Sequence, residues 1–237
     1  MSIKAVLFDL DGTLLPMDQD LFIKIYFGEI TSYLVKNGGY DSDKFIKTMW
    51  QGIEAMMKND GKETNEKVFW DAFSNEYGKE KVEKDYHIFE SFYKERFKET
   101  KGACKSTENT KKIIEYLKKQ GVKIVLATNP LFPLVATKMR IGWAGLEPSD
   151  FELVTTYENI GYSKPNPNYY VEISKRINVL PSECLMVGND TSDDMVAKSI
   201  GMDVFLLTDC LINTKNEDIS CYPNGSFEDL IEYINNK

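Results

Sequence analysis

Apolar residues recur with a helical spacing through one long part of the chain. From about residue 17 to residue 101 they return every three or four positions, as in the stripe that starts at Leu21 and ends before Gly38. Such spacings predict amphipathic helices, and Asp41 or Ser42 and then Thr64 precede later stripes as candidate caps. No strand pattern interrupts this region. We expect about four helices, near residues 21–34, 45–57, 68–77 and 82–97.

Outside this region, short apolar runs alternate with helical segments. The runs predict strands at residues 3–8, 122–127, 151–154, 184–187 and 204–207. Helical spacing is found near residues 107–120, 131–140, 168–177, 195–200 and 226–234. This alternation predicts an α/β fold with a doubly wound parallel sheet. We expect residues 1–16 and 102–237 to form the α/β core domain, with a helical domain of residues 17–101 inserted after the first strand.

Composition narrows the function classes. The chain has 237 residues and a net charge of −8, which disfavours non-specific binding to nucleic acid because that binding depends on clustered lysines and arginines. No segment approaches the roughly 18 apolar residues that a membrane-spanning helix needs. The four cysteines lie far apart and His87 is the single histidine, so a zinc site or a disulfide framework has little support. We expect a cytoplasmic protein that binds neither membranes nor nucleic acid.

Polar residues with useful chemistry follow the predicted strands. The carboxyl ends of parallel strands meet at one edge of the sheet, where active sites of such folds lie. Each group alone has an ordinary explanation, such as a turn at Asp11-Gly12, but their convergence on one edge favours a site. The residues concerned are Asp9, Asp11, Gly12, Thr128, Asn129, Lys164, Asn189, Asp190, Asp193 and Asp194.

This set of groups restricts the chemistry that the edge can perform. Several carboxylates at one point repel each other unless a cation lies among them, and oxygen ligands favour Mg²⁺. A lysine and a hydroxyl beside the metal can hold phosphate oxygens. One carboxylate could attack phosphorus and form an aspartyl-phosphate. A second acid, two residues later, could protonate the leaving oxygen and then deprotonate the hydrolytic water.

Four segments of the chain resemble the four motifs of the haloacid dehalogenase (HAD) superfamily. They are DLDGTLL at residues 9–15, Thr128-Asn129, the segment KPNP at residues 164–167 and GNDTSDD at residues 188–194. They occur in the order of the family. The inserted helical region resembles the α-helical cap of the phosphoglycolate phosphatase-like branch. The resemblance implies a Rossmann-like HAD core with this cap.

The resemblance also implies roles for individual residues. Asp9 would be the nucleophile and a Mg²⁺ ligand, and Asp11 would be the general acid and base, with its backbone carbonyl also on the metal. Lys164 would neutralise the phosphate and the Asp9 carboxylate. The residues implied to bind the phosphate beside Asp9 are Gly12, Thr128, Asn129 and Lys164.

The fourth motif departs from its commonest form, in which an acid follows the glycine directly. Asn189 stands at that position here. We prefer Asp190 as the metal ligand, with Asp194 supporting the metal site through a metal-bound water, because a carboxylate binds Mg²⁺ far better than an amide does. A second register, with Asn189 and Asp193 in these places, remains open.

Together these features predict a Mg²⁺-dependent phosphomonoester hydrolase that acts on a small phosphorylated metabolite through an aspartyl-phosphate. A phosphomutase of the same fold is one alternative. A dehalogenase is another, although Asp11 argues against it, and a non-catalytic phosphate-binding regulatory protein is a third. The sequence does not distinguish a monomer from a homodimer.

Overall fold

The first apolar run forms the central strand of a parallel sheet. The computed structural model describes residues 3–105 and 108–237, and it places β1 (Ala5–Phe8) between two parallel neighbours, β2 (Lys123–Leu126) and β4 (Cys184–Gly188). In these described ranges the sheet has six strands, in the order β3-β2-β1-β4-β5-β6. The remaining strands are β3 (Leu153–Val154), β5 (Asp203–Leu207) and β6 (Asn224–Gly225).

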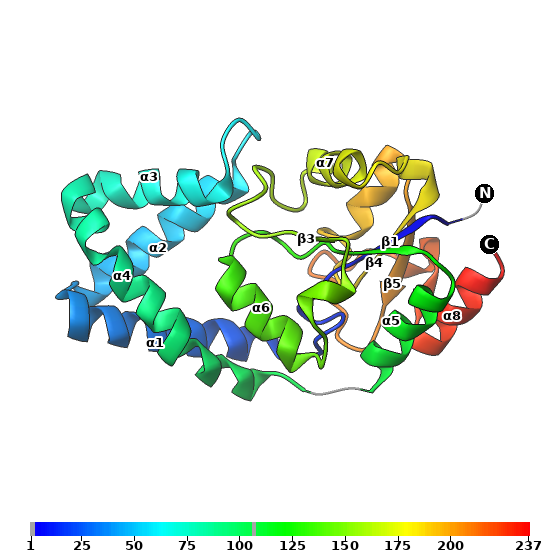
Figure 1. Cartoon of the computed structure of the whole chain (residues 1–237), viewed down its shortest axis with the longest axis horizontal. Coiled ribbons are helices and arrows are strands. Elements are labelled where there is room, and N and C mark those ends of the chain that lie inside the picture. Colours follow the sequence, from blue (N-terminus) through cyan, green and yellow to red (C-terminus); the bar gives the residue numbers. More distant parts are fainter. Residues whose placement is uncertain (1–2, 106–107) are drawn as a thin grey trace.

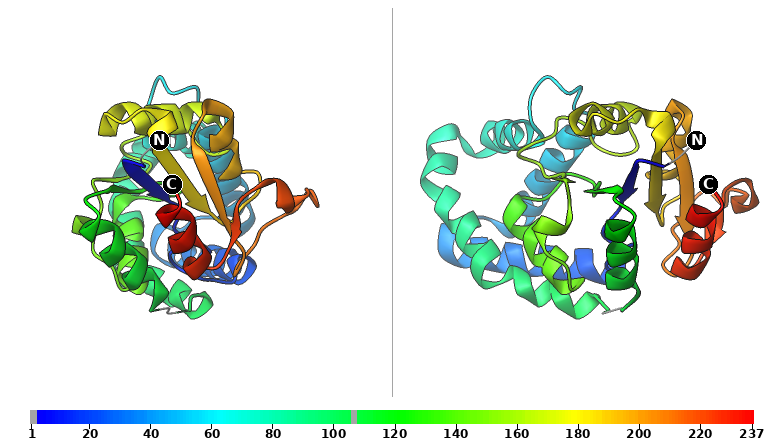
Figure 2. Two further views of the ribbon diagram at one scale, coloured as in Figure 1. Left: turned by 90° about the vertical axis from the view of Figure 1, so that its right-hand side faces the viewer. Right: turned by 45° about the vertical axis from the view of Figure 1, so that its right-hand side comes forward.

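Helices cover both faces of this sheet. Along β1, Val6 and Phe8 belong to one buried cluster and Ala5 and Leu7 to another, because side chains of a strand point alternately to its two faces. In Figures 1 and 2, α7 and η4 lie over one face and α5 and α8 over the other. A fully buried strand matches its continuous apolar sequence.

The helices have the following bounds. The α-helices are α1 (Gln19–Gly38), α2 (Ser42–Met57), α3 (Asn65–Tyr77), α4 (Lys79–Glu95), α5 (Asn109–Lys119), α6 (Leu134–Trp143), α7 (Pro167–Ile177) and α8 (Phe227–Asn235). Short 3₁₀ helices are η1 (Phe97–Ala103), η2 (Pro148–Asp150), η3 (Pro181–Glu183), η4 (Met195–Ile200) and η5 (Ile219–Cys221). None of the helices in the two described ranges is long and apolar enough to cross a membrane.

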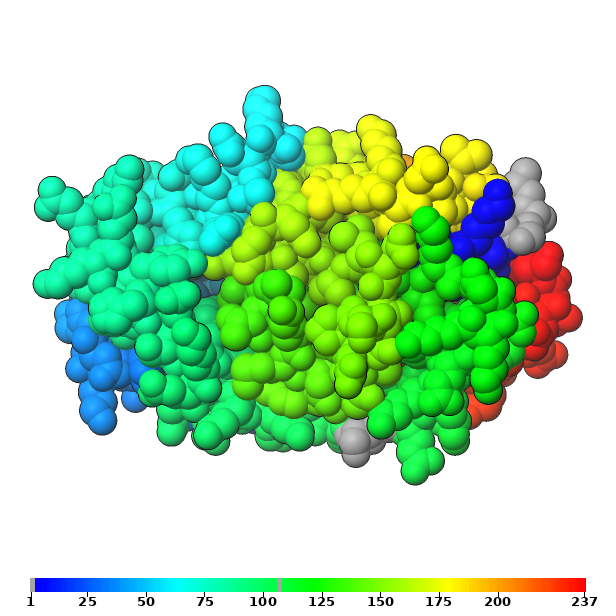
Figure 3. Space-filling model, in the orientation of Figure 1, coloured from blue at the N-terminus to red at the C-terminus, as the bar shows by residue number. Residues whose placement is uncertain are grey.

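The helices α1 to α4 form a separate layer beyond the carboxyl ends of the strands (Figure 1). The chain enters and leaves this layer through neighbouring segments, because Asp18 N–H donates to the carbonyl of Ala103 at 3.0 Å and Lys105 N–H to that of Pro16 at 2.8 Å. Figure 3 shows the chain around residues 130–160 lying between this layer and the helices that flank the sheet.

The predicted doubly wound α/β fold with inserted helices is confirmed. Asp41 and Thr64 cap α2 and α3 through their side chains, as expected. No pattern in the sequence predicts β6, which has only two residues. The start predicted for the helix near residue 107 lies outside the described residues. The exact division into domains at residues 16 and 101 stays a prediction.

Candidate active site

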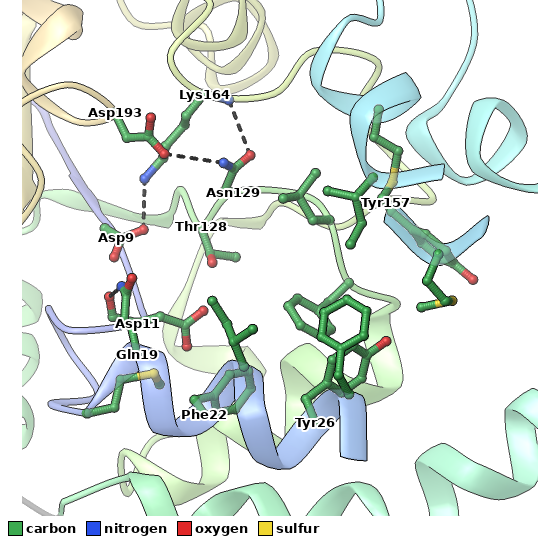
Figure 4. Close-up of a pocket in the computed structure, with 18 of the residues that line it drawn as sticks. Asp9, Asp11, Gln19, Phe22, Tyr26, Thr128, Asn129, Tyr157, Lys164 and Asp193 are labelled. Atoms are coloured by element: carbon green, nitrogen blue, oxygen red, sulfur yellow. Dashed lines mark hydrogen bonds and ion pairs between the residues drawn. The ribbon is translucent and has the colours of Figure 1, made fainter. Parts of the chain in front are cut away.

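The loop that follows β1 carries two carboxylates to the edge of the sheet. Asp9 continues the strand, since its N–H donates to the carbonyl of Val187 at 2.9 Å. The chain then turns sharply, with Leu15 N–H bonded to the carbonyl of Leu10 at 2.8 Å. Asp9 is 8% exposed. The strand thus fixes the backbone of Asp9 and directs its carboxylate into a pocket (Figure 4).

Lys164 joins two of the carboxylates. Its Nζ lies 2.8 Å from Asp9 Oδ1 and 2.6 Å from Asp194 Oδ1, and the lysine is 1% exposed. Burial disfavours the charged ammonium, but the two carboxylates outweigh it and raise the pKa of Lys164 well above its usual value. Lys164 therefore remains a cation at the base of the pocket.

Burial has the opposite effect on the carboxylates. Burial, together with Asp194 and Asp11 nearby, raises the pKa of Asp9 to about 7 even though Lys164 opposes the shift. Burial also raises the pKa of Asp193 to about 6. Crowded carboxylates with raised pKa values are typical of a site that awaits a cation or that handles protons.

The loop after β4 supplies the remaining acids. Asp190 Oδ1 accepts hydrogen bonds from the N–H groups of Ser192 and Asp193 at 2.7 and 2.9 Å. Asp194 uses both oxygens, Oδ1 for Lys164 and Oδ2 for the N–H of Asp190 at 3.0 Å. This geometry favours a role for Asp194 in positioning Lys164, and its predicted support of a metal site stays a prediction.

Asn189, the residue that departs from the fourth motif, joins the loop after β1 to the loop after β5. Its Oδ1 accepts from Thr13 Oγ1 at 3.0 Å and its Nδ2 donates to the carbonyl of Cys210 at 2.6 Å. Gly12 has a φ of +89°, and a Cβ there would lie 2.3 Å from Asn189 Nδ2. Glycine is therefore required at position 12 by this close approach. Gly12 is not among the residues that line the pocket, so its predicted phosphate contact stays a prediction.

Thr128 and Asn129 follow β2 at the same edge. No described residue forms a hydrogen bond with the Thr128 hydroxyl, whereas its carbonyl accepts from Tyr169 Oη at 2.8 Å. Asn129 ties the loops together, since Oδ1 accepts from Lys164 N–H at 3.2 Å and Nδ2 lies 3.4 Å from Asp193 Oδ2 (Figure 4). The free hydroxyl is suited to a phosphate oxygen.

The Asp11 carboxylate has an unexpected partner. Arg140 of α6, fully buried, contacts its Oδ2 through Nη1, while the buried Oδ1 has no hydrogen-bond partner among the described residues. Burial raises the pKa of Asp11, and Arg140 opposes the shift. Gln19 Nε2 donates to the Asp11 carbonyl at 3.0 Å, which leaves one lone pair on that oxygen.

The donors near Asp9 suit a hard cation. Asp9, Asp11, Asp190 and Asp193 all line the pocket and offer oxygen atoms. Among the described residues, no three acidic, histidine or cysteine side chains form a ready-made metal cluster. Mg²⁺ commonly binds through one or two carboxylates, waters and a substrate phosphate, so this sparse oxygen set fits it.

A cavity of about 260 Å³ extends from these loops into the helical layer. Asp9, Asp11, Thr128, Asn129, Lys164, Asp190 and Asp194, all predicted from the sequence, line it at the sheet edge. Side chains from the helices form its other walls, among them Phe22, Tyr26, Met49, Ile53, Trp70 and Tyr93.

Sequence reasoning missed several residues that support the site. Arg140, Gln19 and Tyr169 occupy ordinary positions in amphipathic helices, and no local pattern marks them. Tyr170 was missed as well, and its hydroxyl donates to the carbonyl of Asp193 at 2.6 Å. Tyr169 and Tyr170 lie five and six residues after Lys164, in the helix that begins at Pro167, and this proximity is the one available signal.

Comparisons with known proteins agree with the motifs. A family model described as a haloacid dehalogenase-like hydrolase matches residues 3–201. The bifunctional riboflavin kinase/FMN phosphatase of Arabidopsis thaliana is 26% identical over 84% of this chain, which spans 47% of that protein. Pyrophosphatase PpaX of Bacillus mycoides is 25% identical over 85% of this chain and 81% of the relative.

Solved structures share the fold over nearly the whole chain. A 2-haloacid dehalogenase from Pseudomonas syringae aligns with a TM-score of 0.62 and 18% identity over 99% of each chain. A HAD phosphatase from Thermococcus onnurineus aligns with a TM-score of 0.59 and 21% identity over 98% of each chain. The resemblance inferred from the four motifs is confirmed. With its family model covering most of the sequence, the chain belongs to the haloacid dehalogenase-like hydrolase family and is an enzyme of that family.

Proposed function

We propose that this enzyme is a Mg²⁺-dependent phosphatase that hydrolyses a small phosphomonoester through a covalent phosphate on Asp9. The observation that carries the proposal is the position of the Asp9 carboxylate. It is buried where the cavity meets the sheet edge, 2.8 Å from Lys164 Nζ and beside the acids of the fourth motif. A nucleophile, a fixed cation and oxygen donors for a metal are thus combined in one place.

In the first half of the reaction, a carboxylate oxygen of Asp9 attacks phosphorus and the bond to the leaving oxygen breaks. Asp11 gives its proton to that oxygen, which departs as an alcohol. Burial raises the pKa of Asp11, which favours the protonated form that donates in this step. Lys164 and the Thr128 hydroxyl bind the oxygens of the transferring group.

The second half releases phosphate. Asp11, now ionised, takes a proton from a water molecule, whose oxygen attacks the phosphorus of the aspartyl-phosphate. The bond between phosphorus and the Asp9 oxygen breaks, and the Asp9 carboxylate is restored. Asp11 thereby returns to its protonated form, and the acid and base steps balance.

Mg²⁺ would be held by the Asp9 carboxylate, the Asp11 carbonyl and the Asp190 carboxylate. When bound, it would neutralise the charge that develops on the phosphoryl oxygens. Asp190 suits this role because its hydrogen bonds from described residues all reach Oδ1. Asp193 is the alternative ligand.

The names of relatives support a phosphatase, since the Arabidopsis and Bacillus proteins are called FMN phosphatase and pyrophosphatase. A dehalogenase of the same fold would need neither the metal nor an acid at Asp11. The pairing of Asp11 with a fully buried arginine favours a catalytic role for the Asp11 carboxylate. A phosphomutase would use the same groups, with a second hydroxyl in place of water.

Phosphate release from a panel of phosphomonoesters tests the proposal. We expect release that needs Mg²⁺, stops with EDTA and is lost in Asp9→Asn. Asp43→Asn, which neutralises an exposed acid on α2, is the matched control and should behave as wild type. Near-wild-type release by Asp9→Asn would reject Asp9 as the nucleophile. Halide release from a 2-haloacid, without phosphate release, would favour the dehalogenase.

A further inference from the structure

The wall of the cavity opposite the catalytic loops is made almost entirely of apolar and aromatic side chains. Figure 4 shows Phe22, Tyr26 and Tyr157 on the side away from Asp9 and Lys164. Met49, Ile53 and Phe132 complete much of this wall. A leaving group attached to a phosphate on Asp9 would therefore lie against rings and aliphatic chains.

Charge is confined to one end of the cavity. The acids that line it, such as Asp9 and Asp190, belong to the loops at the sheet edge. Lys164 is the only cation among the described residues that line it, and its Nζ is already shared by Asp9 and Asp194. A second anionic group on the substrate would have no cation to pair with.

The polar atoms of the apolar wall are neutral. The hydroxyls of Tyr26 and Tyr93 are 3.0 Å apart and satisfy each other. Burial raises the pKa of Tyr26 to about 12, so this phenol stays protonated. Burial raises the pKa of the Tyr157 hydroxyl as well, and the indole N–H of Trp70, which also lines the cavity, carries no charge.

Apolar side chains also mark the mouth of the cavity. Ile23 and Trp50 line it and are 43% and 48% exposed. The Trp50 ring stacks on Phe27 with centroids 4.8 Å apart and an angle of 13° between the planes. Large exposed apolar groups that gather at a cavity are typical of a ligand-binding surface.

We propose that the preferred substrate is a phosphomonoester whose leaving group is uncharged, largely apolar and aromatic. This inference rests on the proposed phosphatase function and names its substrate class. The cavity of about 260 Å³ is just below the range of about 300–1,000 Å³ typical of sites for drug-sized ligands, so the group is compact. Leaving groups that carry a carboxylate or a second phosphate are disfavoured, because burying an unpaired charge is costly.

The first test compares two esters that differ by one charge, 2-naphthyl phosphate and 6-carboxy-2-naphthyl phosphate, with phosphoglycolate as a third. We expect kcat/KM for 2-naphthyl phosphate to exceed that for either acid by at least about tenfold. Equal or faster hydrolysis of the acids would overturn the inference while leaving the phosphatase function intact.

A pair of lysine substitutions on α1 assigns the preference to the wall. Ile23 lines the cavity, whereas Leu21 is 40% exposed on the same helix and does not line it. We expect Ile23→Lys to lower the ratio of kcat/KM for 2-naphthyl phosphate to kcat/KM for 6-carboxy-2-naphthyl phosphate by at least about tenfold, because the new lysine gives the carboxylate a cation. Leu21→Lys should leave the ratio unchanged. The same ratio in both variants would contradict the assignment.

A binding measurement separates failure of this inference from failure of the proposed function. Trp50 and Trp70 line the cavity, so quenching of tryptophan fluorescence reports its occupancy. If no ester is hydrolysed, the phosphatase function fails. Binding of 2-naphthol but not of 6-hydroxy-2-naphthoate would then still support an apolar ligand site, and equal binding or none would reject it.

Discussion

The guanidinium of Arg140 contacts the Asp11 carboxylate across the core, although Arg140 is fully buried. Its Nη2 donates to Thr137 Oγ1 at 3.3 Å, and its Cζ lies 4.5 Å from the centre of the Phe132 ring. Arg140 holds one oxygen of Asp11, and the other has no hydrogen-bond partner in the described part of the chain. We interpret Arg140 as a positioning residue that sets the orientation and the proton affinity of the proposed acid and base.

Replacing Arg140 by methionine should weaken both folding and catalysis. Removal of one partner of a buried ion pair leaves an uncompensated charge, which costs about 3–5 kcal/mol in the free energy of unfolding. Urea denaturation measures this loss, and the pH profile of kcat/KM should shift because Asp11 loses a neighbouring cation. Arg140→Lys should restore part of the free energy of unfolding and should return the pH profile part of the way to that of wild type.

Arg96→Met provides the control for this substitution. Arg96 pairs with Glu29 on the surface, and exposed pairs contribute little to folding. The free energy of unfolding of Arg96→Met and its pH profile of kcat/KM should stay close to those of wild type. If Arg140→Met behaved like Arg96→Met in both measurements, the positioning role would be wrong.

The sequence predicted the fold and the loops of the site because both depend on local patterns. The apolar composition of the run that ends at Phe8 is enough to predict its burial. Thr64 caps α3 through a contact within four residues. Arg140 could not be predicted in the same way. Its burial depends on the packing of α6 against Asp11, 129 residues away in sequence, and the residue itself resembles any helix cation. The role of Asn189 depends likewise on Thr13 and Cys210.

The register of the fourth motif can be decided by a magnesium titration. We expect Asp190→Asn to weaken Mg²⁺ activation more than Asp193→Asn, because hydrogen bonds orient Asp190 through one oxygen, whereas Asp193 lies against Asn129. Activity against Mg²⁺ concentration gives the half-saturating value for each variant. The reverse order would establish the register with Asn189 and Asp193.

Mg²⁺ affinity should depend on pH through Asp9. The metal binds the ionised carboxylate, and the pKa of Asp9 is raised to about 7, chiefly by burial. Protons therefore compete with Mg²⁺ below pH 7, and affinity should fall about tenfold between pH 8 and pH 6. Isothermal titration calorimetry measures this dependence, and Asp9→Asn should abolish it. A flat profile would show that Asp9 is already ionised at pH 6.

The same shift affects stability in the metal-free protein. Asp9 binds its proton more tightly in the folded chain than in the unfolded chain, whose pKa is near 3.8. Its contribution to the free energy of unfolding is therefore largest below about pH 4 and declines as pH rises towards 7. Added Mg²⁺ should raise the unfolding temperature more at pH 8 than at pH 6. An increase that does not grow with pH would contradict this linkage.

Asn65 should hold the helical layer to the catalytic loops. It is fully buried at the start of α3, and its Nδ2 donates to the carbonyl of Pro130 at 3.1 Å and to Ser163 Oγ at 3.0 Å. Asn65→Ala should lower the free energy of unfolding by about 1–3 kcal/mol and increase hydrogen exchange near residue 163. Asn37→Ala, which removes one exposed hydrogen bond to Tyr33, is the control. If Asn65→Ala and Asn37→Ala had equal effects, Asn65 would not be the residue that holds the helical layer to the catalytic loops.

Trapping the phosphorylated enzyme tests most directly whether Asp9 is the nucleophile. The protein is mixed with Mg²⁺ and a phosphomonoester that it hydrolyses, and the reaction is quenched in acid. The protein is then reduced with borohydride and digested for mass spectrometry. We expect Asp9 of the wild type to be converted to homoserine, because borohydride reduces an acyl phosphate, and Asp11 to remain unchanged. Wild type that turns over without this conversion, or that carries the label on another residue, would contradict Asp9 as the nucleophile.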